Sequence, residues 1–129
     1  MATDVQTWAD EFRQASDNDE TIGAMRKYFT CSYLLDMGDV RAIVRMHDGK
    51  VDDIDVEPEP LDAWDFALRA SADTWRKFAT PVPEPMYHGI WAASFRSGMK
   101  LEGNLTVMMQ NLRNLTAQLE LLRKTGVPV

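Results

Sequence analysis

Tyr87 and His88 are the pair in this sequence best suited to proton transfer. They are neighbours behind the proline-rich stretch 80–85. Histidine titrates near neutral pH, so this pair would serve as an acid–base couple or bond a polar head group. The simpler interpretation is that His88 begins a helix in water, because loops lie mostly at the surface. The second histidine, His47, precedes a hairpin turn on a polar strand face, and we expect it in solvent.

Eight acidic residues crowd the stretch 48–65: Asp48, Asp52, Asp53, Asp55, Glu57, Glu59, Asp62 and Asp65. Their order does not match an EF-hand loop, which needs acids and a glycine at fixed positions. We therefore expect a solvated outer sheet face rather than a cation site. No metal-ligand spacing, nucleophile elbow or glycine-rich phosphate loop occurs, so we expect no metal and no cofactor. Cys31 is expected to be a small core side chain rather than a nucleophile.

Composition narrows the class of protein. A chain of 129 residues predicts one domain. The net charge of −6 argues against nucleic-acid binding, which needs a basic patch. A single cysteine excludes an internal disulfide and suits a reducing compartment. No apolar run is long enough for a membrane span, and the N-terminus does not resemble a signal peptide, so we expect a cytoplasmic protein.

The stretch 99–122 organises the chain. Met99 and Leu101 alternate with charged residues, which predicts a short strand. Asn104 is a good N-cap for a helix that begins directly after it. The apolar residues then recur at helical spacing and predict one long helix over 105–122; they are Leu105, Met108, Met109, Leu112, Leu115, Leu119 and Leu122. This apolar side must cover a sheet formed earlier in the chain.

The remaining elements are predicted from periodicity. A helix is predicted over 3–18, an ambiguous segment favouring strand over 23–36, and strands over 40–47, 51–56 and 64–69. Asp48-Gly49 predicts a tight hairpin turn. In the fourth strand, Trp64, Phe66 and Leu68 are expected on one face. Ser71 should cap a short helix, and a stiff proline loop over 80–85 precedes a helix over 86–96. This order predicts an α+β fold whose sheet is covered on one face, with the fifth strand on an edge.

Three segments resemble the sterol carrier protein type-two family of small lipid-binding domains. They are the hairpins SYLLDMGDVRAIVRMHDGKVDDIDV, the strand-to-helix step DFALRASADTWRKFA and the ending RSGMKLEGNLTVMMQNL. The resemblance implies a five-stranded mixed, mostly antiparallel sheet covered on one face by helices. It also implies an apolar tunnel between them for sterols, fatty acids or fatty acyl-CoA. We expect a single lipid-binding-like domain over 1–129, with the N-terminal helix over 3–18 and the core over 25–122.

The side chains expected to line that tunnel are Trp75, Phe78, Met86, Tyr87, Ile90, Trp91, Phe95, Met108, Met109 and Leu112. They would equally well fill a solid core.

Three functions stay open. The first is binding of a hydrophobic small molecule: a sterol, a fatty acid or acyl-CoA, or a terpenoid-like lipid. The second is a small enzyme acting on a terpenoid, steroid or polyketide, with Tyr87 and His88 as acid–base pair. The third is a subunit whose Trp/Met surface docks a partner, with a homodimer as one form.

Overall fold

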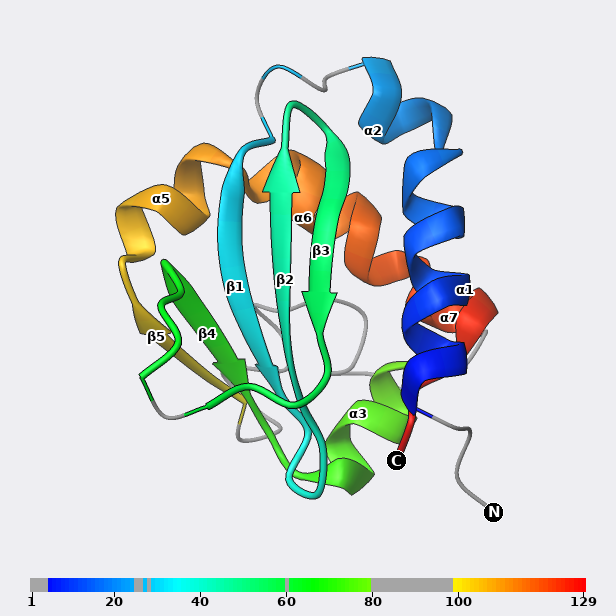
Figure 1. Ribbon diagram of the computed structural model, residues 1–129, viewed down its shortest axis with the longest axis vertical. Helices are drawn as coiled ribbons and strands as arrows, with labels where there is room; N and C mark the ends of the chain where they lie inside the picture. Colours follow the sequence, from blue (N-terminus) through cyan, green and yellow to red (C-terminus); the bar gives the residue numbers. More distant parts are fainter. Residues whose placement is uncertain (1–4, 25–26, 28, 60, 80–98) are drawn as a thin grey trace.

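A mixed sheet of five strands forms the centre of the computed structural model, which describes residues 5–24, 27, 29–59, 61–79 and 99–129 (Figure 1). The strand order is β3-β2-β1-β4-β5. The bounds are β1 (Cys31–Asp36), β2 (Arg41–His47), β3 (Lys50–Asp55), β4 (Phe66–Arg69) and β5 (Lys100–Gly103). Strands β1 and β4 pair in parallel, and the other neighbours pair antiparallel. The predicted mixed, mostly antiparallel sheet with its fifth strand at an edge is confirmed.

The β2–β3 hairpin turns at the predicted position. Asp48 and Gly49 have φ angles of 50° and 81°, and His47 pairs with Lys50 across the turn. A two-residue turn with positive φ at both positions matches the right-handed twist of the flanking strands. Aspartate and glycine tolerate that backbone region better than other residues, so this turn is determined locally.

The two faces of the sheet contribute to hydrophobic clusters of different size. Ala42, Val44 and Met46 of β2 belong to the main core, whereas Ile43 packs with Leu34 and Ala67 in a small second cluster. This alternation is the expected one for β2. The prediction for Trp64 is wrong, because Trp64 packs against the second cluster rather than beside Phe66 and Leu68. β4 begins only at Phe66, so the strand alternation does not extend back to Trp64.

The described N-terminal helices are α1 (Val5–Asp17) and α2 (Glu20–Ala24). In α1, Trp8 and Phe12 are fully buried, and their rings stack with centroids 5.4 Å apart. The Asp17 carboxylate accepts a 2.9 Å hydrogen bond from the Val51 N–H, which ties α1 to the edge strand β3. Of the ambiguous segment 23–36, residues 23 and 24 end α2, and the strand β1 begins at Cys31.

The helix α3 (Ala72–Phe78) begins as predicted. Ser71 is its N-cap, and the serine hydroxyl accepts a 3.2 Å bond from the Thr74 N–H. Trp75 and Phe78 point from α3 into the core, where both are buried. The expected proline loop over 80–85 and the expected helix over 86–96 lie outside the described residues.

The prediction of one helix over 105–122 is wrong. The structure has α5 (Leu105–Gln110), α6 (Leu112–Glu120) and α7 (Leu122–Thr125). At the first break, the Asn111 amide donates to the Val107 carbonyl at 2.8 Å and accepts from the Thr30 N–H at 3.2 Å. An asparagine that bonds backbone groups in this way competes with the helix ladder. The axis therefore changes direction between α5 and α6 (Figure 1).

Candidate functional site

The predicted lining begins at α5, beside β4. Asn104 caps this helix, and its side chain accepts from the Val107 N–H at 3.2 Å. Met108 is fully buried, whereas Leu112 is half-buried. Leu105 and Met109 are 43% and 53% exposed. The α5 stripe, which we define as Leu105, Met108 and Met109, therefore runs from solvent into the core, and Leu112 follows it as the first residue of α6.

The α3 members of the predicted lining lie elsewhere. The Trp75 and Phe78 rings meet edge to face with centroids 5.7 Å apart. The Trp75 indole N–H donates to the Asp36 carbonyl at 2.9 Å, and the Arg123 guanidinium lies 5.2 Å from the Phe78 ring centroid. Helices α3 and α5 lie at opposite ends of the sheet (Figure 1). The described lining residues thus come from opposite ends of the sheet, and Trp75, Phe78 and Met108 belong to one continuous hydrophobic core.

Helix α6 is joined directly to the sheet. The Tyr33 hydroxyl of β1 donates to the Gln118 amide oxygen. The Gln118 amide nitrogen donates to the Ser16 hydroxyl at 2.8 Å and contacts the Met46 sulfur at 3.2 Å. Burial raises the pKa of Tyr33 well above its ordinary range, so the phenol stays neutral. Direct bonds of this kind leave no place for a ligand between Tyr33 and Gln118.

Several predicted site residues lie outside the described part of the chain: Met86, Tyr87, His88, Ile90, Trp91 and Phe95. Both residues of the acid–base hypothesis are among them. His47 is exposed at the end of β2, as predicted. Cys31 is buried, also as predicted, and burial raises the pKa of its thiol to about 12, with a smaller contribution from the Asp65 carboxylate. A neutral buried thiol is a poor nucleophile.

The acidic stretch is largely solvated. Asp48, Asp52 and Asp53 are exposed, and the Arg45 guanidinium pairs with Asp53 at 2.6 Å. Three carboxylates of the stretch accept backbone hydrogen bonds: Asp65 from the Ser32 N–H at 2.9 Å, Asp55 from Glu57 at 3.0 Å and Asp62 from Glu59 at 2.8 Å. Among the residues that the structure describes, no group of three His, Cys, Asp or Glu side chains could hold a metal ion.

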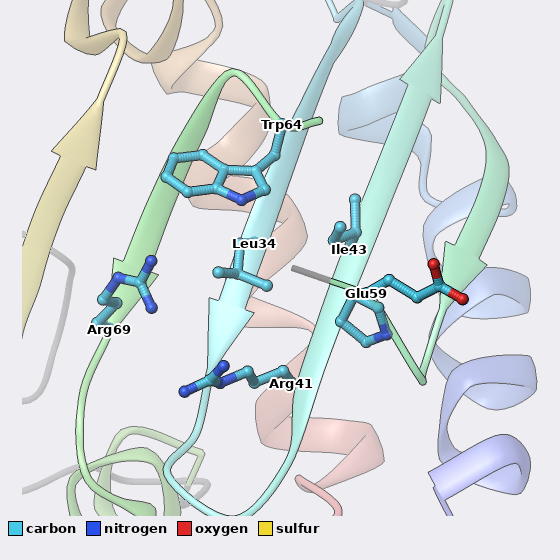
Figure 2. A pocket seen from close by; sticks show the side chains of 7 residues that line it. Leu34, Arg41, Ile43, Glu59, Trp64 and Arg69 are labelled. Carbon is cyan, nitrogen blue, oxygen red and sulfur yellow. The ribbon is translucent and has the colours of Figure 1, made fainter. Parts of the chain in front are cut away.

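The sheet face that points away from the helices carries a hollow that was not predicted. It lies over Leu34 and Ile43, with Trp64 beside it (Figure 2). The sequence carried a signal for it, because Ile43 is apolar at a strand position whose neighbours on the same face are charged. No helix within the described ranges is both long and apolar enough to cross a membrane.

Taken together, these elements define an α+β domain with helices on one face of a mixed sheet. No family model and no curated protein matches the sequence. Solved structures do match. A crystal structure of sterol carrier protein 2 has a TM-score of 0.72 and 17% identity, and the match covers 92% of this chain and 95% of that one. For a Thermus thermophilus protein described as a possible sterol carrier protein, the TM-score is 0.70 at 17% identity, covering 98% and 90%.

A ubiquinone synthesis protein, UbiJ-SCP2, matches with a TM-score of 0.59 and 14% identity, covering 93% of this chain and 91% of that one. At these identities the likeness establishes the fold. The predicted sterol-carrier-protein-like architecture is confirmed, and the chain has this fold over nearly its whole length.

Proposed function

We propose that the protein binds a hydrophobic small molecule between its helices and its sheet. The ligand would be a sterol, a fatty acid or fatty acyl-CoA, or a terpenoid-like lipid. The observation that carries this proposal is the fold, which matches sterol carrier protein 2 over 92% of this chain. That protein is, by its name, a carrier of sterols.

The α5 stripe supports the same proposal. Leu105 is followed by Met108 and Met109 at spacings of three and four residues, so these three side chains lie along one side of α5. Two of them, Leu105 and Met109, are exposed next to the fully buried Met108. An apolar surface that continues from solvent into the core is what a lipid needs to enter. Methionine adapts its shape to irregular guests, which suits a pocket for flexible or ring-shaped lipids.

Binding of this kind requires apolar area rather than a reactive group. Each ligand methylene removed from water contributes about 0.8 kcal/mol. The hydrogen bonds of Gln118 exclude a guest at the middle of α6. We therefore assign the ligand to the part of the helix–sheet interface that α5 covers, on the β4 side.

A displacement titration tests the proposal. The fluorescent fatty acid cis-parinaric acid and the fluorescent sterol dehydroergosterol are titrated into the protein, with palmitate and cholesterol as competitors. We expect saturation at micromolar probe. The double variant Leu105→Gln/Met109→Gln should weaken binding at least about five-fold, because two polar amides replace the apolar entrance.

Leu61→Gln is the matched control, since Leu61 is 96% exposed in the β3–β4 connection. It makes the same chemical change away from α5 and should leave affinity unchanged. Circular dichroism confirms that each variant is folded. Absence of saturation with both probes would overturn lipid binding, and an equal loss in Leu61→Gln would overturn the assignment to α5. Solvent extraction of the purified protein, followed by mass spectrometry, identifies the lipid class.

A further inference from the structure

The outer face of the sheet carries a hollow of about 190 Å³, on the side away from the helices (Figure 2). Its floor is Leu34 and Ile43, which are only 5% and 1% exposed. Both belong to the small second cluster, together with the fully buried Ala67. Because Leu34 and Ile43 are almost completely covered, the surface that the hollow offers comes mainly from the side chains around them, Trp64 and Arg41 among them.

Trp64 forms one wall and is held in place from two sides. A Cβ atom on Gly103 would lie 2.9 Å from Cζ3 of the Trp64 ring, so only glycine lets β5 approach this closely. The Arg69 guanidinium lies 5.7 Å from the ring centroid. Arg69 is itself fixed by Glu102 at 2.7 Å and by Asp36 at 2.9 Å. The aromatic wall is therefore preorganised, and binding need not order it.

Arg41 supplies the charge that a ligand can use. Its side chain is 61% exposed, and its ion pair within the described part of the chain is a single 3.6 Å contact from Nε to Asp36. This geometry leaves the two Nη groups of Arg41 available at the rim. Glu59, the acidic lining residue, carries its carboxylate on the opposite side of the hollow (Figure 2). A guanidinium with an open edge is well matched to a carboxylate.

We propose that this hollow binds a small aromatic monocarboxylate. The ring would lie beside Trp64, above Leu34 and Ile43, with its carboxylate on Arg41. The volume of the hollow suits such a ligand. A dry cavity of about 150 Å³ accepts benzene, and the hollow, at about 190 Å³, is larger by roughly the volume of a carboxylate group. The site is on the face opposite the lipid site, so it does not depend on the proposed function.

Benzoate is the probe for this proposal, titrated into the full ¹⁵N-labelled chain and followed by NMR. We expect saturable shifts at the Trp64 indole N–H and at the Leu34 and Ile43 amides. For a ligand of this size the Kd should be on the order of 1 mM or tighter. Benzyl alcohol, which keeps the ring and lacks the charge, should bind about ten-fold more weakly.

Arg41→Gln should weaken benzoate about ten-fold and leave benzyl alcohol unchanged, because the charge-assisted bonds to the carboxylate are lost. Arg113→Gln, an equivalent change at an exposed arginine of α6, is the control and should have no effect. The proposal is overturned by shifts that do not saturate, by shifts confined to the helix face, or by equal effects of the two variants. Benzoate should also fail to displace cis-parinaric acid, which separates this site from the lipid site.

Discussion

Gln118 offers a direct test of how tightly α6 is closed on the sheet. It is fully buried and uses both ends of its amide, accepting from the Tyr33 hydroxyl and donating to Ser16 and to the Met46 sulfur. Gln118→Leu keeps the size of the side chain and removes every one of these bonds. The Tyr33 and Ser16 hydroxyls are then left buried without their partner.

The expected loss in the free energy of unfolding comes from the Tyr33 and Ser16 hydroxyls. An unsatisfied buried hydroxyl costs about 1–3 kcal/mol, and leucine recovers part of the loss by its larger apolar surface. We therefore expect Gln118→Leu to lower the free energy of unfolding by about 2–4 kcal/mol. The triple variant Ser16→Ala/Tyr33→Phe/Gln118→Leu removes donors and acceptors together. It should regain most of that stability, because replacing both partners of a buried bond is close to neutral.

Urea unfolding followed by circular dichroism measures these changes. Gln110→Leu is the matched control, because Gln110 is exposed on α5 and the change there should stay within about 0.5 kcal/mol. If Gln118→Leu behaves like this control, the network does not join α6 to β1. The ligand would then have room along the whole helix layer, and our restriction of the lipid site to α5 would be wrong.

Two further predictions concern stability. Burial raises the pKa of the Cys31 thiol from 9.0 to about 12, so above pH 9 the unfolded chain loses a proton that the folded protein keeps. The free energy of unfolding therefore falls as pH rises. Between pH 8 and 10, urea titrations should show the wild type losing about 1.4 kcal/mol more of this free energy than Cys31→Ala. The same pH dependence in both proteins would contradict this. Gly103→Ala should cost about 2–3 kcal/mol, because φ is 89° and the new Cβ would lie 2.8 Å from the Asp65 carbonyl oxygen. Gly23→Ala, where nothing lies within 4 Å, should lose no stability, and equal melting temperatures for the two variants would refute the steric argument.

The sequence by itself determined the elements whose cause lies within a few residues. Asp48 and Gly49 adopt positive φ angles because their own side chains permit it. Ser71 caps α3 because its hydroxyl reaches a backbone N–H three residues away. The α+β order and the one-sided helix layer were predictable in the same way, from periodicity.

Tertiary structure alone decided the break at Asn111, because the carbonyl oxygen of its side chain is held by Thr30, a residue 81 positions away. It also decided the face on which Trp64 lies, since Gly103 of the distant strand β5 and Arg69 of β4 contact that ring. It also anchored Trp75 at the end of β1, where its indole N–H bonds the Asp36 carbonyl, and placed α3 and α5 at opposite ends of the sheet. Side-chain spacing determines which residues share a face of their own element, and only the contacts between elements decide which faces meet.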